Sequence, residues 1–455
     1  MRNDEFLSGV IEGFYGRPWS FEQRQALLPR LHGWGFNTYV YAPKDDIKLR
    51  AHWRERYDAN EAEALRKLVQ ACSDAGLHFM YAIAPGLDMR HCDAADLAWL
   101  TGKIDQVTAL GVHDIVLLFD DIPHTLDPAD AERFGSVAAA QAYVADALFT
   151  HLRERRPDGR RLLCPTVYCR RMADHDGDGW GYLHELGRRL EPDVDVFWTG
   201  DEIVSEVVDA ASLADVSEAL GRKPILWENL HANDYDLRRL YLGPYAGRAA
   251  DLPAATGGVL INPNCAFEVN EVAYSTLAAF LRDPAGYEPD AALDDALAAW
   301  RPQFELCGGA ENLTSDELRL LAELLYLPWR SGPGVEALLA DAAALLAASP
   351  DPDDPRLAKL QRFAREVERL LARLTELCDR DLLHALYAVL WEARTESRLL
   401  AEYLTHRARG NQAGRFGKPD KIPNTYRLGF AAAVQALLPL DASGAVVEPS
   451  TEQRG

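Results

Sequence analysis

Two adjacent aspartates, Asp120 and Asp121, directly follow the apolar residues 116–119 and are the side chains of this sequence best suited to acid–base chemistry. Two carboxylates held together in a cleft repel each other, so that one tends to keep its proton while the other stays ionised. A general acid needs that proton, and the remaining anion can polarise a substrate group. Capping a helix or beginning a loop is the commoner role of an Asp-Asp pair taken by itself.

A second polar cluster covers residues 227–236, where Trp227 is followed by amide and carboxylate side chains. A sugar has apolar ring faces and an equator of hydroxyls, so an indole face beside hydrogen-bonding groups is a suitable mixture to bind it. A metal site through His231, Asp234 and Asp236 is an alternative, but no further histidine-rich segment supports it. The cluster favours sugar binding.

Three further polar residues, Lys44, Tyr168 and Asn262, also end apolar runs. Lys44 could donate a hydrogen bond to a substrate hydroxyl, but a surface ion pair of little energetic weight explains it equally well. Structural hydrogen bonds explain Tyr168 and Asn262 as well as contacts with a substrate do. None of the three decides the function alone.

These polar residues stand at the ends of eight short apolar segments, which alternate with segments of helical periodicity up to about residue 283. The predicted strands are residues 8–16, 36–43, 77–85, 114–121, 161–169, 193–200, 223–230 and 258–264. A stretch that can form a helix follows each of them. Eight such units over about 280 residues match an α/β fold of the (β/α)8 TIM-like type, in which the C-terminal strand ends form the active-site face. The sequence therefore predicts a barrel whose rim carries the polar residues.

After about residue 284 the strand pattern ends and the sequence becomes rich in Leu, Ala, Arg and Glu. Helices are predicted at residues 290–305, 314–327, 334–348, 357–377 and 381–407. The fourth carries one apolar stripe, at spacings of three and four, formed by Leu357, Leu360, Phe363, Val367, Leu370, Leu374 and Leu377. We expect three parts: a catalytic barrel (1–283), a stalk-like helical bundle (284–408), and an arm with a terminal helix at 424–438 and a disordered tail (409–455).

The charge balance narrows the possible partners. With 48 Lys and Arg against 70 Asp and Glu, the formal charge is −22, which argues against nucleic acid and suits a neutral substrate. No signal-peptide pattern and no apolar run long enough to span a membrane is present, so we expect a cytoplasmic protein without a membrane partner. The seven cysteines lack metal-binding spacing, so free thiols and no metal are expected.

Five segments closely resemble the motifs of glycoside hydrolase family 84, which contains the O-GlcNAcases. They are residues 9–19 (GVIEGFYGRPW), 41–46 (YAPKDD), 118–122 (LFDDI), 227–236 (WENLHANDYD) and 262–265 (NPNC). The resemblance spans roughly residues 6–280, in order and with compatible spacing. It implies a barrel enzyme that needs no cofactor.

The resemblance also implies a role for each site residue. Asp121 would be the general acid and base, and Asp120 would orient and polarise the 2-acetamido group, whose own oxygen attacks the anomeric carbon to give an oxazoline. The implied sugar contacts are the Gly13 backbone and Lys44 on hydroxyls, Tyr168 and Asn229 on the acetamido region, Trp227 as the pocket wall, and Asp234 and Asn262 on the outer hydroxyls. Glu228 departs from the aspartate that we associate with better-known members, and we expect it outside direct contact with the sugar.

The expected function is that of a retaining exo-β-N-acetylglucosaminidase, which removes terminal β-linked N-acetylglucosamine from a glycoconjugate or glycoprotein. An endo-acting hyaluronidase-type β-N-acetylhexosaminidase is one alternative, and an open cleft would favour it. A catalytically silent protein that binds N-acetylglucosamine is the other. Because the apolar stripe at 357–377 exceeds what one helix needs, we also expect a homodimer through the helical region.

Overall fold

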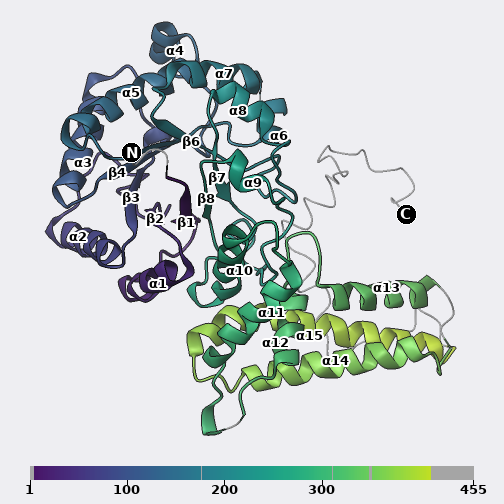
Figure 1. Cartoon of the computed structure of the whole chain (residues 1–455). Helices are drawn as coiled ribbons and strands as arrows, with labels where there is room; N and C mark the ends of the chain where they lie inside the picture. The colour runs from purple at the N-terminus through teal and green to yellow at the C-terminus, as the bar shows by residue number, and fades with distance from the viewer. Residues whose placement is uncertain (1–4, 176, 310, 348–350, 411–455) are drawn as a thin grey trace.

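The computed structural model describes residues 5–175, 177–309, 311–347 and 351–410, which form a closed parallel barrel followed by a helical region (Figure 1). Neighbouring strands pair in sequence order, and β1 also pairs with β8, so that the sheet has no free edge. The strands are β1 (Leu7–Glu12), β2 (Thr38–Tyr41), β3 (His78–Ile83), β4 (Asp114–Leu118), β5 (Arg161–Cys164), β6 (Val194–Trp198), β7 (Ile225–Glu228) and β8 (Gly258–Ile261).

All eight predicted strands are confirmed, but each ends earlier than predicted. Pro43, Pro165 and Pro263 give one reason, since a proline carries no backbone N–H for the ladder. The polar residues placed at the strand ends therefore lie in the loops just beyond the sheet.

Helices surround the strands in Figure 1 and cover the outer face of the barrel. They are α1 (Phe21–Trp34), α2 (Ala59–Asp74), α3 (Ala94–Ala109), α4 (Pro128–Phe134), α5 (Val137–Arg155), α6 (Arg170–His175), α7 (Gly179–Arg189), α8 (Ala214–Leu220), α9 (Leu252–Ala255) and α10 (Glu271–Arg282). Capping boxes at Ser20 and Asp58 fix the starts of α1 and α2. The helix that follows the seventh strand is short: α9 has only 4 residues, and the polar residues 229–236 occupy a loop.

Side chains inside the barrel alternate between its axis and the helical layer, because successive residues of a strand point to opposite faces. In β4, Val116 and Leu118 belong to the inner apolar cluster, whereas Ile115 and Leu117 belong to the cluster beneath the helices. All four are buried. This alternation assigns an inward or an outward direction to every strand residue.

The helical region consists of α11 (Pro289–Trp300), α12 (Ser315–Leu324), α13 (Pro333–Ala347), α14 (Pro355–Leu374) and α15 (Arg380–Ala408). The predicted helices are confirmed, except that the first ends at Trp300, where Arg301–Gln303 form a 3-10 turn around Pro302. Figure 1 shows α13, α14 and α15 side by side, extending away from the barrel. The apolar stripe of α14 is covered within the chain by these neighbours, and only its Phe363 stays partly exposed.

The main apolar core continues from the barrel into the helical region, through Leu293, Trp300 and Phe304 to Leu377 and Leu382. A smaller cluster joins the far ends of α13, α14 and α15. Among the described residues, no helix is both long and apolar enough to cross a membrane. The predicted terminal helix at 424–438 and the tail lie outside the described residues.

Candidate active site

A pocket of about 250 Å³ opens beyond the C-terminal ends of the barrel strands. Every residue that the sequence indicated as catalytic or sugar-binding lies in its wall. The lining consists of Gly13, Tyr15, Lys44, Asp120, Asp121, Cys164, Tyr168, Thr199, Ile203, Val204, Trp227, Asn229, Ala232, Asp234, Tyr235 and Asn262. Closure of the barrel thus brings the loops after most of its strands to one small volume.

Most lining residues continue the inward side of their strands. Val116 and Leu118 point to the barrel axis, and Asp120 lies two residues further on. The same two-residue step leads from Ile11 to Gly13, from Ala42 to Lys44, from Trp227 to Asn229 and from Leu260 to Asn262. The alternation of the strand therefore accounts for their common direction.

Asp121 breaks this alternation and still reaches the pocket, because its backbone turns. Its φ of 54° lies in the left-handed region, and within the described part of the chain it is the one non-glycine residue with a positive φ. Such a conformation costs about 1–3 kcal/mol and is found mainly at functional sites. Two adjacent carboxylates consequently face one pocket, although a regular strand would send them to opposite sides.

Asp120 and Lys44 form a buried ion pair on the pocket wall, with each residue only 7% exposed. The ammonium contacts Asp120 Oδ2, whereas Asp120 Oδ1 is buried and has no hydrogen-bond partner. A desolvated carboxylate oxygen without a donor is costly unless a ligand supplies one. Asp120 is therefore fixed through one oxygen and prepared to accept an N–H through the other.

Asp121 is held by two tyrosine hydroxyls. Tyr15 Oη donates to Asp121 Oδ2 at 2.8 Å, and Tyr168 Oη donates to Oδ1 at 2.7 Å. Burial and the nearby Asp121 carboxylate raise the pKa of both hydroxyls well above its usual value, so they keep their protons and act as donors. Asp121 is exposed and has neutral partners, unlike Asp120 with its ammonium. The two carboxylates therefore have different environments.

The amide side chains of Asn229 and Asn262 form a short chain along another part of the wall. Asn262 Nδ2 donates to Asn229 Oδ1 at 3.0 Å, and Asn229 Nδ2 donates to the Ile203 carbonyl at 2.8 Å. Asn262 Oδ1 is buried without a partner, as is the free oxygen of Asp120. The pocket thus offers two unused acceptors.

The indole of Trp227 lies against Gly13. A Cβ atom on Gly13 would stand 2.5 Å from Trp227 Cζ2, so only glycine allows this approach. The Lys44 ammonium lies 5.8 Å from the centre of the Trp227 ring. An apolar face therefore stands beside the charged groups.

Asp234 links the loops that follow β1 and β7. Its Oδ2 accepts a hydrogen bond from the Tyr15 backbone N–H at 2.9 Å. Burial and the Asp121 carboxylate raise the pKa of Asp234 above its usual value. Tyr235, beside it, is 54% exposed at the pocket mouth and shares a hydrogen bond of 2.6 Å with the Tyr241 hydroxyl.

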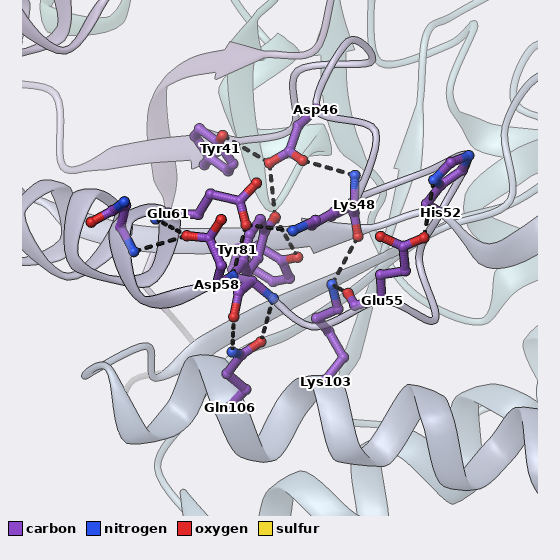
Figure 2. A network of polar contacts seen from close by, with 12 residues as sticks. Tyr41, Asp46, Lys48, His52, Glu55, Asp58, Glu61, Tyr81, Lys103 and Gln106 are labelled. Carbon is purple, nitrogen blue, oxygen red and sulfur yellow. Dashed lines mark hydrogen bonds and ion pairs between the residues drawn. The ribbon is translucent and has the colours of Figure 1, made fainter.

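The loop that carries Lys44 is anchored by the polar network of Figure 2. The Tyr41 hydroxyl donates to Asp46 at 2.9 Å. Lys103 of α3 is fully buried, and its ammonium donates to the Lys48 carbonyl at 3.0 Å. Burial lowers the pKa of Lys103 to about 8. A side chain from the helical layer therefore holds this loop through its backbone.

Two outward-facing glutamates at the strand ends are each paired with a buried arginine. Glu12 accepts from Arg24 Nε and Nη2 at 2.8 and 2.6 Å, and Glu228 accepts from Arg248 at the same two distances. Glu228 also accepts from the Leu230 N–H at 2.9 Å. These pairs stand next to Gly13 and between Trp227 and Asn229, so they fix the backbone from which pocket residues extend. Glu228, which replaces the aspartate associated with the family, therefore lies behind the pocket and not in it, as expected.

Some of the lining residues could not be predicted from the sequence. Tyr15 was the most informative omission, since it lies two residues after Gly13 on the inward side and donates to Asp121. The others carried no comparable signal: Cys164, Thr199, Ile203, Val204, Ala232 and Tyr235. The first five of these resemble ordinary packing residues in the sequence, and Tyr235 stands within the polar cluster of residues 227–236 without a role assigned to it.

The alternative of a metal site at residues 231–236 finds no support in the geometry. The described residues include no group of histidine, cysteine and acidic side chains able to hold a metal ion. His231 is fully buried, with Nε2 2.8 Å from the Gly243 carbonyl, and burial lowers its pKa to about 4. Asp236 instead pairs with Arg238.

Comparisons with known proteins point to one family. The model of a family described as beta-N-acetylglucosaminidase matches residues 8–313. The chain is 41% identical over 337 residues to Protein O-GlcNAcase of Mus musculus and, equally, of Rattus norvegicus, covering 72% of this chain and 36% of each relative. It therefore spans little more than a third of their length. A solved mutant of the Thermobaculum terrenum O-GlcNAc hydrolase has a TM-score of 0.75 at 26% identity, covering 88% of this chain and 83% of that one.

The buried ion pair behind Trp227 and Asn229 can be tested by Glu228→Gln. The substitution keeps the shape of the side chain but leaves the buried Arg248 guanidinium without its counter-charge, which should lower the free energy of unfolding by about 3–5 kcal/mol. Denaturant unfolding measures the change. The matched control is Glu63→Gln, which removes an exposed pair with Arg66 on α2 and should have almost no effect. Equal stabilities of the two variants would contradict the bracing role of Glu228.

Proposed function

The chain belongs to the beta-N-acetylglucosaminidase family, since the family model matches residues 8–313, and on that premise we propose that it is a retaining exo-β-N-acetylglucosaminidase. Its substrate is a terminal β-linked N-acetylglucosamine of a glycoconjugate. The observation that carries this proposal is the unequal support of two adjacent carboxylates in one pocket. Asp120 keeps one buried oxygen without a donor, and Asp121 is exposed between two hydroxyls.

In the first step the acetamido oxygen of the substrate attacks the anomeric carbon, and the bond from that carbon to the leaving oxygen breaks. Asp121 gives its proton to the leaving oxygen. Asp120 accepts a hydrogen bond from the acetamido N–H through Oδ1, which increases the electron density on the attacking oxygen. As the ring closes, the N–H proton passes to Asp120 Oδ1, so the product of this step is a neutral oxazoline.

In the second step water attacks the same carbon from the side that the leaving group vacated. Asp121 takes a proton from the water, the bond between the anomeric carbon and the oxazoline oxygen breaks, and Asp120 returns its proton to the nitrogen of the acetamido group. Two inversions give net retention. The nucleophile belongs to the substrate, so the enzyme needs no second carboxylate across the ring.

The remaining pocket residues bind and orient the sugar. Lys44, Asp234 and Asn262 contact ring hydroxyls together with the Gly13 backbone, and Trp227 packs against an apolar face. Tyr168 and Asn229 border the acetamido group. The unused acceptor of Asn262 suits a hydroxyl donor.

The size of the pocket favours exo action over the endo-acting hyaluronidase alternative. About 250 Å³ lies below the range of about 300–1,000 Å³ that drug-sized ligands occupy, and it suits a single sugar residue. The complete acid–base pair argues against a silent binding protein. The names of the rodent relatives support a glycoprotein as the natural glycoconjugate.

We further propose that residues 1–283, 284–408 and 409–455 are the barrel, helical and arm parts of the chain, and that the helical part forms a homodimer. The stripe on α14 is already covered, but α15 exposes Tyr387 and Trp391, whose rings lie 5.7 Å apart. Exposed aromatic pairs of this kind are typical of interfaces.

The activity is tested with an aryl 2-acetamido-2-deoxy-β-glucoside and, as control, the aryl β-glucoside that lacks the acetamido group. Turnover of the first alone is expected, because only the acetamido group supplies the nucleophile. Steady-state release of the aryl alcohol measures both. Equal turnover of the two would contradict the substrate-assisted mechanism, and binding of N-acetylglucosamine without turnover would support the silent alternative.

The roles of the two aspartates are separated by leaving-group dependence. Asp121→Asn should slow substrates with poor leaving groups roughly 10²–10⁴-fold and activated aryl substrates much less, since a good leaving group needs little protonation. Asp120→Asn should slow both classes. Values of kcat/KM for both substrate classes measure the effect, with Glu63→Gln as the unaffected control. An equal loss on both classes in Asp121→Asn would count against the assignment.

The dimer is tested by sedimentation velocity at micromolar concentration. The protein should sediment as a dimer, and Trp391→Glu should shift it to monomer because a charge then replaces an apolar contact. A wild-type protein that sediments only as a monomer removes this proposal.

A further inference from the structure

Cys307 and Cys378 stand face to face in the helical region, although 71 residues separate them in sequence. Their Sγ atoms lie 2.6 Å apart, and both residues are exposed thiols. A disulfide bond has a length of about 2.05 Å, so bonding requires only a small movement of the two sulfurs. No hydrogen bond or bridge joins any other pair of the seven cysteines, all of which the structure describes as free thiols.

Backbone pairing fixes this approach. An isolated antiparallel bridge joins Leu306 to Leu377, with the Cys307 N–H donating to the Glu376 carbonyl at 2.8 Å and the Cys378 N–H donating to the Glu305 carbonyl at 2.9 Å. Both leucines are buried. Because side chains alternate along paired backbones, the cysteines that follow them turn outward on one face.

The turn that carries Cys378 is itself held in place. The Arg380 guanidinium donates to the carbonyls of Thr375 and Leu377 at 3.0 and 3.1 Å, and the Asp379 side chain caps α15 by accepting from the Leu382 N–H. A turn fixed in this way keeps the second thiol near the first. Two groups held together react at a high effective concentration.

The cysteine pair also marks a junction in the fold. Cys307 follows α11, which packs on α10 of the barrel, and Cys378 occupies the turn between α14 and α15. Asp379 and Asp381 share a surface hollow with Phe267 and Glu268 of the loop after β8. A covalent bond between the two cysteines would therefore tie the turn of the α14–α15 hairpin to the segment that leaves the barrel.

We propose that Cys307 and Cys378 form a reversible dithiol–disulfide site, oxidised by a low-molecular-weight disulfide such as oxidised glutathione, which braces the helical region against the barrel. The Cys307 thiolate attacks one sulfur of the small disulfide, whose S–S bond breaks and releases one small thiolate. The Cys378 thiolate then attacks Cys307 Sγ and releases the second. The protein loses two protons and two electrons, and the small disulfide gains both as it becomes two thiols.

The order of attack follows from the surroundings of the second thiol. The hydrogen bond with Cys307 raises the pKa of Cys378 to about 11, so this thiol is mostly protonated near neutral pH and suits the second, resolving step. Closing a ring that contains α12, α13 and α14 restricts the unfolded chain, which stabilises the folded state. The catalytic pocket contains neither cysteine, so the site acts on the helical region.

The test starts from the fully reduced, full-length protein. It is incubated with oxidised glutathione at pH 8, unfolded without reductant, alkylated, and analysed by intact mass and peptide mapping. Five of the seven cysteines should be alkylated, and one linked peptide pair should contain Cys307 and Cys378. Dithiothreitol should restore all seven. The linked protein should unfold at a temperature a few degrees higher than the reduced protein.

Two kinds of variant make the outcome decisive. Cys378→Ser should stop at a glutathione adduct on Cys307 and show no stabilisation, whereas Cys92→Ser, which removes a thiol elsewhere, should still form the internal bond. Seven alkylated cysteines in the treated wild type, a lasting glutathione adduct, or a link between other cysteines would each overturn the proposal. A linked protein with an unchanged unfolding temperature would overturn the bracing role.

Discussion

A parallel strand that closes into a barrel turns every second side chain toward the barrel axis, and the chemistry of this protein depends on that alternation. Below the rim, inward positions carry aliphatic side chains that fill the barrel. One or two steps further along the same lines stand Gly13, Lys44, Asp120, Asn229 and Asn262. The inward side of the strands therefore continues into the pocket at these positions, and Asp121 joins them through its left-handed backbone.

The outward positions at the same rim explain why the pocket can be rigid. Glu12 and Glu228 face the helical layer, where each accepts two hydrogen bonds from one buried arginine. Their charges are fully paired, in contrast to the free oxygens of Asp120 and Asn262 on the inward side. The rim of the barrel thus carries paired charges behind the pocket and unpaired acceptor oxygens inside it. The paired charges hold the backbone from which the pocket residues extend.

The helical region is joined to the barrel through packing as well as through the chain. The main apolar cluster runs across the junction from Leu293 and Trp300 to Leu377 and Leu382, whereas the far ends of the helices share a smaller cluster of their own. Buried apolar contacts therefore hold the end of the helical region that lies next to the barrel. The cysteine pair stands at this anchored end, where a covalent bond adds to contacts that already exist.

The sequence alone determined the barrel, its eight strands and the residues at its rim, because strand alternation and helical periodicity are local properties that a short window displays. It could not determine which side chains these residues contact. The pairing of Lys44 with Asp120 and the contacts of the Tyr15 and Tyr168 hydroxyls with Asp121 require loops from different strands to meet, and the pairing of Glu228 with Arg248 requires the long connection after β7 to fold back. Closure of the barrel brings these loops into contact. Periodicity in the sequence indicates the direction in which a side chain points. Only the tertiary structure determines which residue that side chain contacts.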